Sequence, residues 1–371
     1  MIAPELIKDC ILRPSIVTSL SQKQLSDLVI VLRQQKLLAT FAVLAQEQQV
    51  FEDLPEQTKR HLLNALVVVS RQNEQVTVEA LRIKDILSET SEFVVFLKGA
   101  AYSLAKLPLS KGRIYSDIDV LVEEKNIKQC EQALVLDGWA YTEISDYDDM
   151  YYRKWAHEIP PMQHITRGTS IDVHHNIIPV VSKDSPKVAK LVPYIQTRAD
   201  GIQVLNPEMQ FVHSAVHLFR NEEYKTALRD LFDLYFMLVS QEQSFIEDVL
   251  EVAKDVGFLY ETGLALYFIN HTLGFNCSDV LITHALGEKS KFRVWLDISI
   301  FSRIFVPTHP LIQHSKHATA HFFAMLRGHF IKMPIGLLIY HISMKSFRGI
   351  VTKIMGEHFF TPEDSKSQGL K

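Results

Sequence analysis

The chain has 371 residues, 47% of them hydrophobic, and a formal net charge of −4. It is long enough for two domains, or for one domain with large helical extensions, and it can fill a sizeable apolar core. With this net charge, the chain has no overall basic character that would require a nucleic-acid partner. The three cysteines, Cys10, Cys130 and Cys277, are isolated and lack CxxC spacing, which argues against a disulfide framework or a cysteine zinc site.

The N-terminal segment, residues 1–90, is predicted to be helical. Its first residues lack the basic-then-apolar order of a signal peptide, and no apolar run in the chain reaches the roughly 18–20 residues that cross a bilayer. We therefore expect a cytoplasmic protein without a transmembrane segment. Helical spacing of apolar residues (Leu25, Leu28, Val29 and Leu32) follows the candidate N-caps Ser19 and Ser21, and two further helices are predicted over residues 58–73 and 76–87.

A strand, a glycine turn and a short helix are predicted over residues 93–108. Residues 93–97 are all β-formers, and this run stops at Lys98-Gly99. Residues 100–107 then predict a helix that Pro108 ends. A glycine at such a junction lets backbone N–H groups approach a phosphate closely at the positive end of a helix.

Two aspartates follow on a second strand, predicted over residues 117–122. Side chains alternate along a strand, so Asp117 and Asp119 share one face, while Ile118, Val120 and Val122 point into a core. Two carboxylates on one face suit Mg²⁺, which takes oxygen ligands and leaves room for substrate phosphates. A solvent-exposed strand face also accounts for two aspartates, so the pair alone leaves both interpretations open.

Residues 126–178 are predicted to alternate between helix and strand. The pattern gives a helix over residues 126–136 that ends at Asp137-Gly138, a strand over 139–142, a loop over 146–152, and strands over 152–159, 161–166 and 169–175. Arg167-Gly168 forms the turn between the last two strands. This hairpin would place Asp172 beside the acidic strand of residues 117–122.

Histidines cluster around that hairpin: His157, His164, His174 and His175. Such groupings can bind a transition metal, but no second set of ligands stands at a defined spacing. A structural role and a role in contacting substrate remain open beside the metal site.

The rest of the chain is predicted to be helical. Residues 206–240 predict two helices, with His213 and His217 on one face of the first. These histidines fit either a metal pair or a hydrogen bond from His217 to Asp230 or Asp233, and we expect the hydrogen bond. Residues 289–353 carry an excess of basic side chains: Lys289, Lys291, Arg293, Arg303, Lys316, Arg327, Lys332, Lys345, Arg348 and Lys353. This excess is either a solvated face or a surface for a polyanion or an anionic membrane. The polar tail, residues 363–371, is expected to fray.

These segments together resemble a known family. The pattern begins with the hydrophobic Leu97 and Lys98-Gly99 and continues at Ser116-Asp117-Ile118-Asp119. It resembles the motif of the nucleotidyltransferase superfamily of the DNA polymerase β type. More narrowly, LKG, Arg113 and SDIDVLV resemble an uncharacterised bacterial nucleotidyltransferase family. The segments Ile171-Asp172-Val173-His174 and LRDLFD (residues 228–233) extend the resemblance, which covers about residues 80 to 240.

The resemblance implies an α+β fold. Its centre would be a polymerase β-like nucleotidyltransferase core with a small mixed sheet over residues 91–180. An N-terminal helical segment, residues 1–90, and a C-terminal helical domain, residues 181–371, would flank it.

The resemblance also implies metal-dependent transfer of a nucleoside monophosphate from an NTP, with ATP expected, to an acceptor hydroxyl, with release of pyrophosphate. Asp117 and Asp119 would bridge two Mg²⁺ or Mn²⁺ ions, and Asp172 would hold the metal nearest the attacking hydroxyl and help to deprotonate it. Nucleotide contacts are implied for Lys98, Gly99, Ala100, Arg113, Ser116 and Arg229, and for Arg229 a contact to the acceptor is the alternative. Arg113 would either neutralise the leaving pyrophosphate or form a salt bridge within its own loop.

The acceptor stays open: a protein side chain, a tRNA end, a sugar and a small molecule all fit. The chain departs from the superfamily at Ala100, where a serine often helps to hold the triphosphate. Backbone amides and Lys98 could compensate for the missing hydroxyl. The alternative is a catalytically degenerate protein that uses the fold for binding or as a scaffold.

Overall fold

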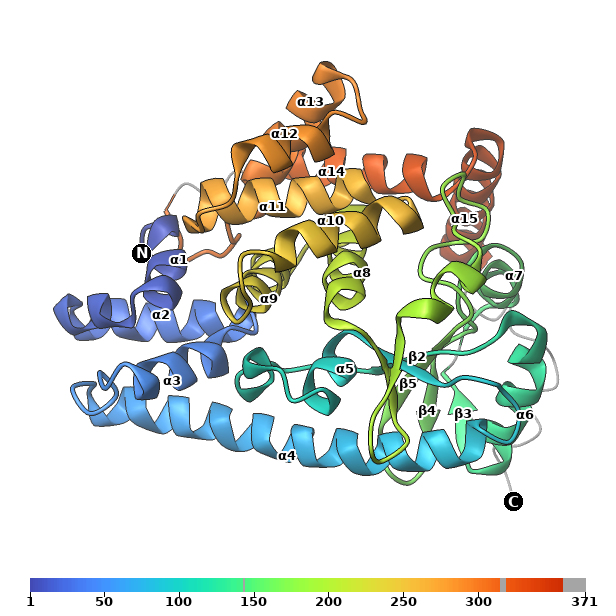
Figure 1. Ribbon diagram of the computed structural model, residues 1–371, viewed down its shortest axis with the longest axis horizontal. Helices are drawn as coiled ribbons and strands as arrows, with labels where there is room; N and C mark the ends of the chain where they lie inside the picture. The colour runs from blue at the N-terminus through green and yellow to red at the C-terminus, as the bar shows by residue number, and fades with distance from the viewer. Residues whose placement is uncertain (143, 314–317, 356–371) are drawn as a thin grey trace.

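The computed structural model describes residues 1–142, 144–313 and 318–355. It is a mixed α/β structure in which helices surround a small sheet (Figure 1). Two parts of the sequence prediction lie outside the described residues: Lys316 of the basic segment and the tail of residues 363–371.

The described residues form a small mixed sheet, as predicted, which lies toward one side of the molecule (Figure 1). Its strands are β1 (Val95–Leu97), β2 (Ile118–Leu121), β3 (Trp139–Tyr141), β4 (Met162–His164), β5 (Ser170–His174), β6 (Ile195–Thr197) and β7 (Gln203–Leu205). They lie in the order β3-β4-β5-β2-β1-β7-β6. β2 is antiparallel to β1 and parallel to β5, while β1 and β7 are parallel. The predicted strands around residues 93–97, 117–122, 139–142, 161–166 and 169–175 are confirmed.

The N-terminal helices are α1 (Pro4–Leu12), α2 (Gln22–Gln34), α3 (Leu38–Glu47) and α4 (Glu56–Leu87). Ser21 caps α2 in a capping box with Gln24, which confirms one of the two predicted caps. The two helices predicted over residues 58–73 and 76–87 are wrong as separate elements, because α4 is continuous and runs along one edge of the molecule (Figure 1). No glycine or proline interrupts it, and Val69, Val76, Ala80 and Ile83 continue one buried face.

Short helices connect the strands of the sheet: α5 (Lys98–Leu104), α6 (Ile127–Leu136) and α7 (Asp146–Trp155). Gly138, at φ 96°, lies just after α6 and confirms the predicted glycine stop. The loop predicted over residues 146–152 and the strand over 152–159 are wrong, because α7 occupies most of both. Ser145 caps α7, acidic residues fill its first turn, and Arg153 and Lys154 lie in its last turn.

The remaining helices are α8 (Pro207–Arg220), α9 (Ala227–Val239), α10 (Phe245–Val256), α11 (Leu259–Leu273), α12 (Asp279–Leu286), α13 (Lys291–Ile304), α14 (Ala318–Lys332) and α15 (Ile335–Met355). Asn206 caps α8, and Pro207 occupies its first turn, as the sequence predicts. Short 3₁₀ turns are η1 (Pro14–Ser19), η2 (Pro108–Lys111), η3 (Glu124–Asn126), η4 (Val188–Lys190) and η5 (Val192–Tyr194).

Two apolar clusters hold these elements together. The larger joins helices α1–α3 to helices α8–α13, and the smaller lies between the sheet and the second half of α4. Ile118, Val120 and Val122 all belong to the smaller cluster, as predicted from their alternation with the aspartates. The three-part division at residues 90 and 180 stays a prediction.

The basic residues of the C-terminal helices do not share one surface. Arg293 and Arg327 both bind Asp297, and Arg327 is only 6% exposed. A polyanion-binding role for the remaining cations stays a prediction. None of the helices in the described part of the chain has the length and hydrophobicity needed to span a bilayer.

Candidate functional site

An aspartate from each of two neighbouring strands forms the centre of the candidate site. β2 and β5 run parallel, and their register pairs Asp119 with Asp172. Neighbouring strands lie about 4.8 Å apart, and residues in register point to the same face of a sheet. The prediction that the hairpin places Asp172 beside the acidic strand is therefore confirmed.

Asp117 lies one residue before β2 and completes a group of three carboxylates. Ser116 donates a hydrogen bond of 3.0 Å to Asp117 Oδ1. Asp117 lines two neighbouring cavities, one shared with Asp119 and the other with Asp172. The three predicted acidic residues thus converge on one region, where the two cavities meet.

Asp119 is held by two donors. Lys98 Nζ lies 2.5 Å from Asp119 Oδ1, and His174 Nε2 lies 2.9 Å from the same oxygen. Burial would raise the pKa of Asp119, but the attraction of Lys98 and the hydrogen bond from His174 outweigh it and hold that pKa well below its usual range. The carboxylate of Asp119 is therefore negatively charged at neutral pH.

Lys98 reaches Asp119 from a strained position. It begins α5 directly after β1, with a φ of 47° that few non-glycine residues adopt. This left-handed backbone lies at the junction that the sequence identifies as the glycine turn.

Asp172 has the opposite electrostatic environment. Burial and repulsion from Asp119 and Glu158 raise the pKa of Asp172 to about 8. Three carboxylates that repel one another in a partly buried site fit a divalent cation, which would take oxygen ligands and remove the repulsion. Asp117, Asp119 and Asp172 would hold such an ion.

This environment predicts a pH-dependent stability. Because the folded pKa of Asp172 exceeds the unfolded value of about 3.9, the folded chain keeps a proton that the unfolded chain has released, and stability falls as pH rises from about 4 to 8. In EDTA, Asp172→Asn is therefore expected to melt a few degrees above the parent at pH 8, and this gap should shrink toward pH 4. Thermal unfolding at several pH values measures it.

Asp53→Asn, the same change at an exposed position, serves as the control and should shift neither curve. An equal melting temperature for Asp172→Asn and the parent at pH 8 would mean that Asp172 is already fully solvated.

The first cavity has a volume of about 160 Å³ and carries charges of both signs. It is lined by Lys98, Gly99, Tyr102, Arg113, Tyr115, Ser116, Asp117, Asp119, Ser214, His217, Arg229, Asp230 and Asp233. Lys36 lies nearby, and its pKa is lowered by burial and by the positive charges of Arg229 and Arg113. Cations that repel one another around a cavity favour an anionic ligand there.

Arg113 forms its ion pairs across the cavity with α9, while its Nη1 donates to the carbonyl of Ile114 in its own loop. Its Nε lies 2.6 Å from Asp233 Oδ2, and its Nη2 lies 3.7 Å from Asp230 Oδ1. The bond expected from His217 to Asp230 or Asp233 is not formed, because these carboxylates face Arg113 and Arg229 instead. Arg113 therefore anchors α9 to the loop that precedes β2.

Loss of this buried ion pair should cost stability. Arg113→Met would leave Asp233 buried, with its charge uncompensated by the guanidinium, and should lower the free energy of unfolding by about 3–5 kcal/mol. Denaturant titration measures the change. Arg153→Met removes a more exposed arginine that pairs with Glu131 and Asp149, and should cost less than about 1 kcal/mol. Similar losses for the two variants would show that the Arg113 pair contributes no more than a surface pair.

Gly99 and Ala100 occupy different environments. Gly99 lines the first cavity, and a Cβ at this position would lie 2.9 Å from the Cβ of Tyr115. Ala100 is 1% exposed, and its side chain belongs to the apolar cluster beneath the sheet. A hydroxyl in place of the Ala100 methyl would therefore enter that core, so a contact from Ala100 to a ligand would have to use its backbone N–H.

The second cavity, of about 260 Å³, lies on the Asp172 side. Its polar lining includes Lys98, Asp117, His157, Glu158, Asp172, Ser182, His217, Arg220, Asn221 and Lys332, and its apolar lining includes Ile177, Ile178, Pro179, Val216 and Ile331. The two cavities share Lys98, Asp117 and His217.

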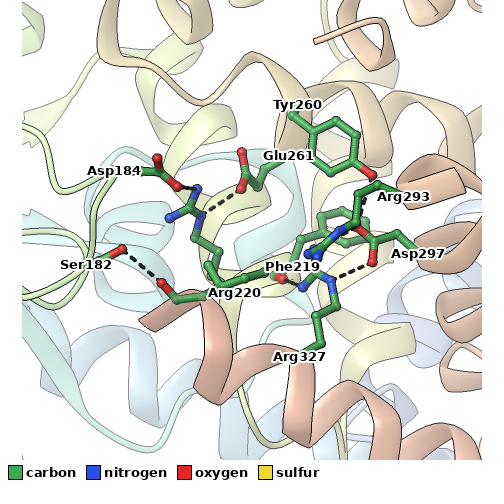
Figure 2. A network of polar contacts seen from close by, with 10 residues as sticks. Ser182, Asp184, Phe219, Arg220, Tyr260, Glu261, Arg293, Asp297 and Arg327 are labelled. Carbon is green, nitrogen blue, oxygen red and sulfur yellow. Dashed lines mark hydrogen bonds and ion pairs between the residues drawn. The ribbon is translucent and has the colours of Figure 1, made fainter. Parts of the chain in front are cut away.

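A network of ion pairs fixes the far wall of the second cavity (Figure 2). Arg220 donates to Glu261 at 2.7 Å and to Asp184 at 2.8 Å, while Ser182 donates to the carbonyl of Ile331 at 3.1 Å. Next to it, Arg327 binds the fully buried Asp297 at 2.7 Å and the carbonyl of Phe219. These contacts tie α8 to α11, α13 and α14, so this wall is held from several directions.

The four histidines around the hairpin separate in the structure. His157 and His174 pack together with ring centroids 5.1 Å apart. His164 packs edge-on against Trp139 instead, and its Nε2 lies 3.0 Å from the carbonyl of Asp137. Glu158 joins His157 and His174, a grouping that the sequence analysis did not identify, although Glu158 directly follows His157 in the chain.

The two histidines of α8 are buried near the acidic centre. Burial lowers the pKa of His213 to about 3, with a smaller effect from Lys98, and the pKa of His217 is lowered for the same reasons. Both are neutral at physiological pH. Of the two, His217 lines the cavities.

The predicted site residues thus fall into two groups, one along each cavity. Lys98, Gly99, Arg113, Ser116, Asp117, Asp119 and Arg229 line the first cavity, and Asp172 lines the second. Asp230 and Asp233 belong to the same motif as Arg229, yet their pairing with Arg113 was not predicted. Lys36 was also missed, because nothing in the helical pattern around it marks a residue that lies near a distant cavity.

Comparison with known proteins agrees with this geometry. Residues 21–274 match the model of a family described as "uncharacterised nucleotidyltransferase". No curated protein and no solved structure matches the chain. Since the family model covers more than half of the chain, this protein belongs to the uncharacterised nucleotidyltransferase family.

Proposed function

We propose that the protein transfers a nucleoside monophosphate from Mg²⁺-bound or Mn²⁺-bound NTP, with ATP expected, to an acceptor hydroxyl and releases pyrophosphate. One observation carries the proposal: Asp119 and Asp172 stand in register on parallel strands between a cavity lined with cations and a second cavity. Membership of a nucleotidyltransferase family supports it. The proposed core is polymerase β-like, and the proposed location is the cytoplasm of a bacterium.

The first cavity is the proposed site of the triphosphate. Arg229 and Lys98 line it, Lys36 lies nearby, and their positive charges would attract phosphate oxygens. Gly99 leaves space there because it has no side chain. Arg113 forms ion pairs with Asp233 and Asp230, so its proposed role is to hold α9 and Arg229 in place.

The second cavity is the proposed site of the acceptor. Asp172 is the carboxylate of the central pair that lines this cavity, which supports the proposal that it takes the proton of an acceptor hydroxyl. That oxygen would then bond to the α-phosphorus as the bond to the β-phosphate breaks, and pyrophosphate would leave from the first cavity. Divalent cations held by Asp117, Asp119 and Asp172 would supply charge stabilisation at the attacking and leaving oxygens.

The alternative of a degenerate binding protein rested on Ala100. Since the Ala100 side chain lies in the apolar core, its lack of a hydroxyl removes nothing from the cavity walls, where Ser116 and Ser214 provide hydroxyls. Ala100 therefore no longer favours a loss of activity.

Thermal stabilisation by nucleotides tests the proposed binding site. Each of ATP, CTP, GTP and UTP is added with Mg²⁺ or with EDTA, and the melting temperature is measured. We expect at least one NTP to raise it with Mg²⁺ and much less with EDTA, since a ligand that binds the folded chain stabilises it in proportion to RT ln(1 + [L]/Kd). No shift with any nucleotide would contradict the proposal.

The glycine turn gives a further prediction. Gly99→Val would push Tyr115 out of place in the first cavity, so it should weaken Mg·NTP binding at least about tenfold, or 1.4 kcal/mol, with a smaller effect on stability. Calorimetry measures the affinity. Gly168→Ala is the control, because Gly168 has φ 68° and no neighbour within 4 Å of an added Cβ, so it should lower the melting temperature and leave binding unchanged. A Gly99 variant that loses stability and affinity together would indicate a purely structural glycine.

A further inference from the structure

We infer that His157, Glu158 and His174 form a binding site for a divalent transition metal, distinct from the oxygen-only site of the three aspartates. One ligand atom from each side chain lies within 4.8 Å of those of the other two. Two imidazoles and a carboxylate are a donor set for Zn²⁺ and neighbouring transition ions rather than for Mg²⁺, which prefers oxygen.

Two buried ring nitrogens that form no hydrogen bond mark the position of the ion. His174 is 2% exposed, and its Nδ1 has no hydrogen bond, although Glu158 Oε2 lies 3.3 Å away. His157 Nδ1 is likewise buried without a partner. A buried ring nitrogen without a partner is costly, and a cation bound to both nitrogens and to the carboxylate would satisfy all three groups at once.

The tautomer of His174 fits this arrangement. Its Nε2 lies 2.9 Å from Asp119 Oδ1, and because a carboxylate only accepts, Nε2 carries the proton. In the neutral ring, Nδ1 then presents a lone pair toward Glu158. A histidine that donates one N–H to a carboxylate and offers the other nitrogen to a cation is the usual arrangement around protein-bound metals.

The spacing fits as well. In a tetrahedral site with bonds of about 2.1 Å, ligand atoms lie about 3.4 Å apart. The 3.3 Å between His174 Nδ1 and Glu158 Oε2 matches this value, and a ligand atom of His157 lies within 4.8 Å of the other two.

Backbone hydrogen bonds hold the three ligands in place. Residues 157–159 lie along β5: the carbonyl of His157 accepts from the N–H of His175 at 2.8 Å, and the N–H of Ile159 donates to Val173 at 3.0 Å. Glu158 and His174 form an antiparallel bridge. His157 and Glu158 also line the second cavity, so a fourth position on the metal would be open to water or a ligand.

The site would act on Asp119 through His174. A metal on Nδ1 keeps His174 neutral with its proton on Nε2, so the hydrogen bond to Asp119 is fixed in direction. His174 would then be a positioning residue for Asp119, and the metal would also neutralise Glu158, which faces Asp172.

Cobalt titration of the untagged, EDTA-treated full-length protein tests the inference. We expect one equivalent of Co²⁺ to give the visible absorption of a nitrogen-ligated, low-coordinate ion, Zn²⁺ to displace it, and millimolar Mg²⁺ to leave it unchanged. Zn²⁺ should also raise the melting temperature of the parent. These readouts require no nucleotide and no activity.

Variants locate the ion. His157→Ala and the isosteric Glu158→Gln should each weaken Zn²⁺ binding at least about 100-fold, while His284→Ala, the same loss of an imidazole at an exposed helical position, should not. Asp117→Asn should keep the cobalt spectrum and lose Mg·NTP binding, which separates this site from the proposed catalytic one. Circular dichroism in EDTA confirms that each variant is folded.

Three results would overturn the inference: no cobalt spectrum in the parent, unchanged Zn²⁺ affinity in folded Glu158→Gln, or loss of the spectrum in Asp117→Asn. The last would place the ion at the aspartates. Metal binding without nucleotidyl transfer would leave the inference standing and count against the proposed function alone.

Discussion

Asp119→Asn is expected to reduce nucleotidyl transfer by a factor of about 10³ or more. The amide keeps the shape of the carboxylate and can still accept from Lys98 and His174, but it loses the charge that holds a divalent cation. A loss of several kcal/mol in transition-state stabilisation corresponds to this factor. Binding of Mg·NTP should fall as well, because Asp119 lines the cavity proposed for the triphosphate.

The measurement combines the transfer rate, calorimetry with Mg·NTP and thermal unfolding. The variant must remain folded, and Asp53→Asn provides the matched control at an exposed site. Wild-type affinity for Mg·NTP in folded Asp119→Asn would show that the aspartates are not the metal site.

Asp172→Asn is expected to separate binding from chemistry. Asp172 lines the acceptor cavity, so Asp117 and Asp119 should still hold Mg·NTP without it. We expect the NTP affinity to stay within about tenfold, or 1.4 kcal/mol, while transfer falls by orders of magnitude. The group that takes the hydroxyl proton would be missing.

Two outcomes would count against this role. Retained transfer would make Asp172 a simple strand residue and require another acid, for which Glu158, a lining residue of the second cavity, is a candidate. Equal losses of affinity and rate would mean that Asp172 serves the nucleotide rather than the acceptor.

Local sequence patterns predicted most of the sheet. Alternation around Asp117 and Asp119, the β-formers of residues 93–97 and the turn at Gly168 are short-range signals. The hairpin of β4 and β5 was readable because a hairpin needs only neighbouring residues. The parallel pairing of β2 with β5, which brings Asp119 beside Asp172, joins distant parts of the chain and leaves no short-range signal.

Two helices were misread for opposite reasons. The break predicted in α4 between residues 73 and 76 lies in the polar stretch of residues 70–75, but a helix without glycine or proline continues through a polar turn. α7 was read as loop and strand because its residues are acidic and aromatic, although Ser145 caps it and its charges complement the helix dipole.

The contacts of the site that escaped prediction are tertiary. Arg113 pairs with Asp233, 120 residues away, and Ala100 turns into the core while Gly99 faces the cavity. Glu158 meets His174 only because residues 157–159 pair with β5. None of these contacts leaves a periodic trace in the sequence.

Transfer of label from NTP tests the central claim most directly. The protein is incubated with Mg²⁺, cell lysate and each NTP labelled either at the α-phosphate or at the γ-phosphate, beside Asp119→Asn as the inactive control. The account predicts that an acceptor gains label from an α-labelled NTP with the parent and not with Asp119→Asn. Kinases of the lysate transfer γ-label in both samples, so γ-label should be equal with the two proteins. Extra γ-label with the parent, or tight Mg·NTP binding without transfer of α-label to any molecule, would contradict the account.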